Sequence, residues 1–307
     1  MTDAAIDALP PVQREAFERA VRLNWWQIGW VASIVVVMGL AMGGSQAMKT
    51  AWVEDLLAFV PPIAFLIGAR LERRAPSAAF PFGFGRVNGL GFFVSAAALF
   101  TVGGLLLLEA GRTLLAQEHA TVGSVRVLGR DVWLGWLMVA AQAYAAIPPL
   151  IIGRKLLPLA RMLNDKLLHT NALMSKADWM TGLAGMGGVI GLGMGWWWAD
   201  ALAAAIISVD ILHDGANSLR AATAELVDGA PRKLDDAELS DEANALHREL
   251  DRRFPGARVR LRETGRLIRA EVIGPLPAEA PDRASLWPGD PDQAWRFAQL
   301  SFTPERR

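Results

Sequence analysis

Six long apolar stretches follow one another along the first three quarters of the chain. They cover residues 25–42, 47–69, 87–108, 132–152, 168–194 and 197–227. A helix needs about 20 mostly apolar residues to cross the hydrocarbon core of a membrane. The pattern therefore predicts a membrane all-α bundle of six transmembrane helices.

The pattern changes after Pro231. Residues 232–307 carry 28 of the 62 charged side chains, 14 basic and 14 acidic. Within them, 235–253 has apolar positions at helical spacing, and alternation then predicts strands near 259–261 and over 267–273. A last strand or short helix is expected near residues 295–302.

These observations predict three parts. They are a cytoplasmic N-terminal segment (1–23), a transmembrane domain (24–231) and a small α+β cytoplasmic C-terminal domain (232–307).

Composition narrows the class of protein further. Hydrophobic residues make up 52% of the 307 residues and the mean hydropathy is +0.26, which is too high for an ordinary soluble enzyme. The formal net charge is zero, whereas a nucleic-acid binder would carry a basic excess. Cys is absent, which excludes thiolate metal sites. His occurs only four times, which argues against an enzyme built on a His-rich metal site. We therefore expect no enzymatic activity, no resident cofactor and no nucleic-acid partner.

Basic residues lie mostly on one side of the predicted bundle. With the N-terminus inside, the cytoplasmic segments hold eleven Lys and Arg residues and the opposite loops hold four. An excess of these residues is typical of cytoplasmic loops. Both termini are therefore expected in the cytoplasm, with the chain embedded in the lipid bilayer of an inner or plasma membrane.

Ionisable residues inside the predicted spans are candidates for function, because burying one at mid-bilayer costs about 2.5–3.5 kcal/mol on insertion scales. Glu54 and Asp55 lie in the second span, and Asp178 lies in the fifth. Three residues precede Asp178 by seven, four and three positions and so share its helical face: Asn171, Met174 and Ser175. Together these residues predict a cation or proton site.

Lys176 leaves a second interpretation open. It is two residues from Asp178, so it cannot face that carboxylate on one helix. It can pair with Glu54 or Asp55 across the bundle, which would neutralise the site without transport. Asp210 and Asp214, in the sixth span, are expected near its cytoplasmic end as surface residues.

Four segments resemble the cation diffusion facilitator family of divalent-metal/proton antiporters. The family's second span is similar to 45–58 (SQAMKTAWVEDLLA), and its loop motif Tyr/Phe-Gly-His-Gly-Arg/Lys is similar to 82–86 (FGFGR), here without the His. Its fifth span resembles 171–178 (NALMSKAD), and the opening of its sixth resembles 197–201 (WWADA). The four occur in the family's order.

The resemblance implies a metal site with two ligands from the second span and two from the fifth. By position the pairs fall on Glu54 with Ala58 and on Met174 with Asp178, and Asp55 is the expected substitute for Ala58. A site rich in oxygen and without His suits manganese or ferrous iron better than zinc, although zinc stays a candidate.

The function implied by the resemblance is export of a divalent metal from the cytoplasm in exchange for protons, by alternating access, in a homodimer. The alternative is a degenerate family member that acts as a membrane scaffold or partner subunit without transport.

Overall fold

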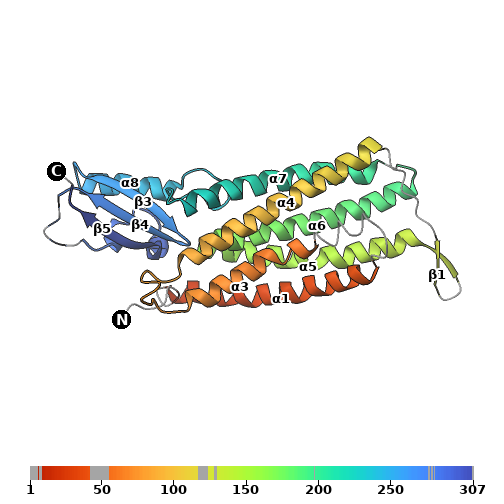
Figure 1. Cartoon of the computed structure of the whole chain (residues 1–307), viewed down its shortest axis with the longest axis horizontal. Helices are drawn as coiled ribbons and strands as arrows, with labels where there is room; N and C mark the ends of the chain where they lie inside the picture. Colours follow the sequence, from red (N-terminus) through yellow and green to blue (C-terminus); the bar gives the residue numbers. More distant parts are fainter. Residues whose placement is uncertain are drawn as a thin grey trace.

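The computed structural model describes residues 6, 9–41, 55–116, 124–127, 130–196, 198–275, 277, 279 and 281–305. Long helices run along the long axis of the molecule, and a small α+β unit lies at one end (Figure 1). The helices of the bundle are α1 (Pro11–Ala41), α3 (Val60–Glu72), α4 (Arg86–Ala116), α5 (Leu134–Leu163), α6 (Lys166–Gly193) and α7 (Ala199–Leu226). The prediction of a mostly helical chain with a small C-terminal sheet is confirmed.

Among the described residues, two helices are long and apolar enough to cross a membrane: α1 over Pro11–Val37 and α4 over its full length. The length and composition of the described helices therefore support two spans and do not by themselves establish the predicted six.

The helix boundaries differ from the predicted spans most clearly in the first and second stretches, and α4 and α5 also extend beyond the predicted ends at 108 and 152. α1 begins at Pro11, well before the apolar stretch that starts at residue 25, because Phe17 and Ala20 are already buried in the core. The second stretch contains a helical turn at 55–57 and then α3, and its first part, 47–54, lies outside the described residues.

Helices α4 and α7 pack with their backbones close together. A Cβ atom at Gly103 of α4 would lie 2.8 Å from the Leu212 backbone nitrogen, and one at Gly215 of α7 would lie 2.7 Å from the Phe100 backbone. Only glycine fits both positions, which is how small residues bring membrane helices together.

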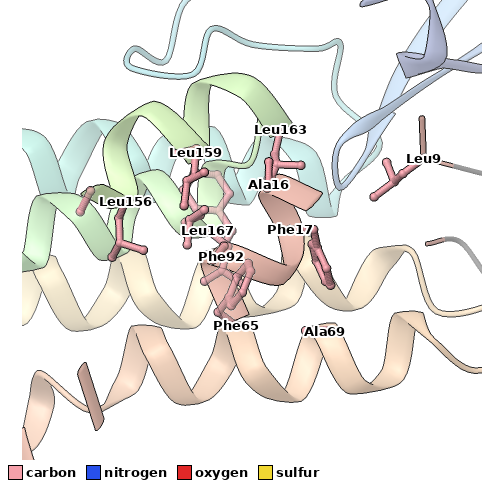
Figure 2. Packing of buried hydrophobic residues seen from close by; sticks show 14 of the residues in the cluster. Leu9, Ala16, Phe17, Phe65, Ala69, Phe92, Leu156, Leu159, Leu163 and Leu167 are labelled. Carbon is pink, nitrogen blue, oxygen red and sulfur yellow. The ribbon is translucent and has the colours of Figure 1, made fainter. Parts of the chain in front are cut away.

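The largest apolar cluster lies at the end of the bundle that faces the C-terminal unit. Figure 2 shows Phe65 and Phe92 close to Leu167, with Phe17 on one side of them and Leu156 on the other. The Phe17 and Phe65 ring centroids are 5.7 Å apart. The cluster joins α1, α3, α4, α5, α6 and α7, so this end of the bundle is held as one packed unit.

The C-terminal unit places one helix against a three-stranded sheet. The helix α8 (Asp241–Arg253) starts after Ser240, whose hydroxyl accepts a hydrogen bond from the Ala243 backbone N–H. The strands lie in the order β3 (Arg258–Thr264), β4 (Leu267–Ile273), β5 (Phe297–Thr303), with β3–β4 antiparallel and β4–β5 parallel. Leu246 and Leu250 of α8 pack on one face of this sheet, and the last predicted segment is a strand.

Three short elements complete the described chain. A hairpin of β1 (Ser124–Val127) and β2 (Arg130–Trp133) lies at the opposite end of the molecule from the C-terminal unit (Figure 1). The short 3-10 helices η2 (Ala284–Leu286) and η3 (Pro291–Arg296) lie between β4 and β5.

Candidate functional site

Two of the predicted ligands, Asn171 and Ser175, face α1. The Asn171 and Gln27 amides bond each other reciprocally at 2.9 and 2.8 Å, and Asn171 also donates to the Asn24 side-chain oxygen at 2.7 Å. The Gln27 amide donates to the Ser175 hydroxyl at 3.3 Å. All four side chains are buried. The polar atoms of Asn171 and Ser175 are therefore engaged in a hydrogen-bonded network between α1 and α6.

Met174 is fully buried in an apolar cluster between α6, α4 and α7. Its partners there include Leu99 of α4 and Ile211 of α7. The thioether thus packs against aliphatic side chains, on a different side of α6 from Asn171 and Ser175. The sequence-based expectation that these three point the same way does not describe their contacts.

The structure brings the segment after Asp55 next to the middle of α6. Leu57 and Val60 pack against the cluster that contains Met174 and Ala177. Asp55 is half-buried just before them, and Asp178 is half-buried just after Ala177. One apolar cluster therefore includes residues from the described parts of both the second and the fifth predicted span.

The full predicted ligand set cannot be assembled from the described residues, because Glu54 lies outside them. Within the part of the chain that the structure describes, no group of three or more Asp, Glu or His side chains is placed to hold a metal ion. Asp55 and Asp178 are the described carboxylates of the predicted site.

The Lys176 side chain points to α7. Its ammonium lies 2.6 Å from an Asp210 carboxylate oxygen and 3.1 Å from one of Asp214. The suggested pairing with Asp55 is therefore wrong for this structure, and so is the assignment of Asp210 and Asp214 as plain surface residues. Their spacing of four residues on one helix is the sequence signal that could have suggested a shared partner.

A cavity of about 170 Å³ opens beside this ion pair. Among the residues that line it are His169, Lys176 and Asp214 from the bundle and Asp235 from the segment after α7. Near neutral pH, Lys176 is positively charged, and Asp214 and Asp235 are negatively charged. The cavity therefore gives ions a polar surface beside α6.

A second charged group, which sequence reasoning missed, joins the bundle to the C-terminal unit. The Arg266 guanidinium lies 2.7 Å from a Glu72 carboxylate oxygen and 2.6 Å from one of Asp165. Its side chain is 8% exposed, and those of Glu72 and Asp165 are 4% and 0% exposed. The guanidinium also lies 4.9 Å from the centre of the Phe17 ring.

The charges of this junction favour the ionised form of Arg266. Burial by itself lowers the pKa of Arg266, but Asp165 and Glu72 raise it above its ordinary value. Beside it, the Lys166 ammonium pairs with the Glu263 carboxylate, and both are almost completely buried. The turn between β3 and β4 therefore docks on the bundle through buried ion pairs.

Comparison with known proteins identifies the class. The chain matches the family model of the cation efflux transmembrane domain over residues 28–227, so it belongs to the cation efflux family. Proteins of this family are membrane transporters of metal cations and not enzymes, in agreement with the sequence-based prediction.

Among curated proteins, the chain is similar to “Putative transporter MamV” of Paramagnetospirillum magneticum (strain ATCC 700264 / AMB-1). The two are 26% identical over 209 residues, which cover 67% of this chain and 58% of that protein. The chain thus aligns with less than two thirds of that relative's length.

Proposed function

We propose that this protein exports a divalent metal cation from the cytoplasm in exchange for protons. The observation that carries the proposal is the meeting of two segments in a cation efflux fold. Leu57 and Val60, just after Asp55, pack against the apolar cluster that contains Met174 and Ala177, just before Asp178. Carboxylates from two separate helices of a membrane bundle are the groups expected of an ion pathway.

The outer surface of the bundle supports insertion of all six helices into a bilayer. Every helix of the bundle has a large apolar side chain that the rest of the protein leaves exposed, as expected of helices that face lipid. Examples, one per helix, are Val36, Ile67, Leu108, Ile147, Ile190 and Ile206. In the proposed arrangement the chain spans the membrane six times, with both termini in the cytoplasm.

The ligand chemistry of the proposed site favours hard ions. Asp55, Asp178 and Glu54 would supply carboxylate oxygens, which manganese and ferrous iron accept readily. Zinc stays in the set of candidate substrates. Asn171 and Ser175 are held by α1 and Met174 is packed among aliphatic groups, so the proposal assigns the metal mainly to the carboxylates.

Exchange of metal for protons follows from the same carboxylates. Burial favours the protonated form of a carboxylic acid, whereas a nearby dication favours the ionised form. Metal and protons therefore compete for Asp55 and Asp178. Release of the metal on the far side leaves carboxylates that take up protons, and these return to the cytoplasm when the site faces inward again.

Alternating access requires parts of the bundle to move relative to each other. Helices α4 and α7 are joined closely at Gly103 and Gly215, and they contact the site through the Met174 cluster. In our proposal this pair moves as one body against the other four helices, and the protein works as a homodimer.

The experiment that tests the proposal is metal uptake into proteoliposomes that contain the full chain and an internal proton-sensitive dye. We expect uptake of manganese or iron(II), and more weakly of zinc, with counterflow of protons. The Asp178→Ala variant should abolish metal-dependent proton flux, while Asp251→Ala, an exposed change on α8, should not alter it. Absence of flux with every metal, in a folded protein, would favour the scaffold alternative.

A further inference from the structure

The face of the C-terminal sheet that points away from α8 is lined with arginines. Arg260 and Arg262 of β3 alternate with Val259 and Leu261, which belong to the apolar face. In the antiparallel pairing of β3 with β4, Arg262 lies directly opposite Arg269. Like charges in directly opposite positions destabilise a sheet, so this pairing calls for a counter-charge.

The described residues supply only part of that counter-charge. The Asp228 carboxylate pairs with Arg86 and, at 3.3 Å, with Arg262, and a Glu271 carboxylate oxygen lies 3.9 Å from the Arg260 guanidinium. By contrast, the partner described for Arg269 is the neutral Gln299 amide at 2.8 Å. The Arg269 Nε–H is buried and has no hydrogen-bond partner in the described part of the chain. A buried guanidinium N–H without an acceptor is costly.

The electrostatic surroundings of Arg269 are mainly positive, which favours binding of an anion. Burial lowers the pKa of Arg269 from its ordinary value, and the nearby positive charges of Arg262 and Arg86 lower it further. An anion beside these three guanidinium groups would have the opposite effect.

There is room for a ligand at this place. A cavity of about 480 Å³ opens over the arginine face and is lined by Asp228, Arg260, Arg262, Arg269, Glu271, Gln299 and Ser301, among others. Asp228 follows the end of α7, and Arg86 is the first residue of α4. The cavity therefore lies beside the junction of the bundle and the C-terminal unit. Figure 1 shows this junction at one end of the bundle, the end that we propose to lie at the cytoplasmic surface of the membrane.

We propose that this cavity binds a phosphate group, carried either by the headgroup of an anionic phospholipid or by free phosphate. Arginine forms pairs of parallel charge-assisted hydrogen bonds with phosphate oxygens. Arg262 and Arg269 would hold the phosphate through their guanidinium groups, and the Gln299 amide and Ser301 hydroxyl are further polar groups of the lining. The site is separate from the proposed metal pathway, and its test does not depend on transport.

The test compares two charge-neutralising variants of the full chain. Arg269→Gln removes the guanidinium of the cavity. The matched control, Arg258→Gln, removes an exposed arginine on the same face of the sheet, in the neighbouring strand β3, that does not line the cavity. Binding of inorganic phosphate is measured by titration calorimetry in detergent. Binding of phosphatidylglycerol against phosphatidylcholine is measured by native mass spectrometry after extraction from mixed nanodiscs.

We expect the affinity for the phosphate group to fall about tenfold or more in Arg269→Gln, as for the loss of charge-assisted hydrogen bonds, and to stay unchanged in Arg258→Gln. A loss seen with both probes would identify a site for phosphate in general. A loss seen only with phosphatidylglycerol would assign the site to lipid. If Arg269→Gln does not fold, Arg262→Gln serves as the second variant.

Equal binding by wild type, Arg269→Gln and Arg258→Gln would overturn the proposal. So would an unchanged affinity for both probes combined with a shift between monomer and dimer in Arg269→Gln, because the arginine face would then be an interface between two copies of the chain.

Discussion

The helix α6 buries polar groups in two different ways along its length. At its first residue, Lys166 forms an ion pair with Glu263, and the neighbouring Asp165 pairs with Arg266. About one and a half to two and a half turns further on, Asn171 and Ser175 are buried with neutral amides of α1. Full charges are thus buried at the junction with the C-terminal unit, and neutral groups are buried inside the bundle.

The difference has a physical reason. Removing a charge from water costs several kcal/mol, which only a close and well-oriented partner offsets. At the junction these partners come from a separate unit that docks on the helix ends. Inside the bundle, amides satisfy each other at a lower desolvation cost. A carboxylate inside a membrane bundle, such as Asp178, is by contrast a candidate for a functional role.

Loss of the central cation of the junction should have the largest effect. Arg266→Ala leaves Glu72 and Asp165 buried without their guanidinium partner, so we expect the free energy of unfolding to fall by about 3–5 kcal/mol. Thermal unfolding in detergent and the rate of trypsin cleavage after α7 measure this. The control Arg252→Ala removes an exposed arginine of α8. An unchanged midpoint and cleavage rate would show that the buried pairs do not hold the junction.

Disruption of the amide network should have an intermediate effect. Asn171→Leu leaves the Gln27 amide buried without its reciprocal partner, and we expect a loss of about 1–3 kcal/mol. The double variant Gln27→Leu with Asn171→Leu replaces both amides by apolar groups and should recover much of that loss. Stability that falls further in the double variant would contradict a mainly structural role for this pair.

Removal of the Lys176 ammonium should have the smallest effect. Lys176 is 37% exposed, and its partners Asp210 and Asp214 are 47% and 25% exposed. Pairs with this exposure contribute about 1 kcal/mol or less, so Lys176→Gln should lower the midpoint of thermal unfolding only slightly. A loss as large as that of Arg266→Ala would mean that the ion pair is sealed from water.

Much of the fold could be predicted from the sequence, because hydropathy and alternation are local signals. They located the helices of the bundle and the strands that carry Val259 and Ile268. The start of α1 was missed, since its first turns are polar outside and bury only a few side chains such as Phe17.

The candidate site was less predictable, because it depends on the rotation of helices about their axes. The spacing along the sequence placed Asn171, Met174 and Ser175 near Asp178. It could not predict which neighbouring helix each side chain would contact. The partners of Lys176 and Arg266 lie 34 residues or more away along the chain, and no local pattern predicts such pairs.

The most direct test of the central claim measures metal-driven proton flux in two variants of α6 side by side. Our account predicts that Asp178→Asn, which keeps the size of the side chain and removes its charge, abolishes the flux. It also predicts that the Gln27→Leu, Asn171→Leu double variant, once shown to be folded, transports at close to the wild-type rate. Wild-type flux in Asp178→Asn, or loss of flux only in the folded double variant, would contradict the assignment of the metal to the carboxylates.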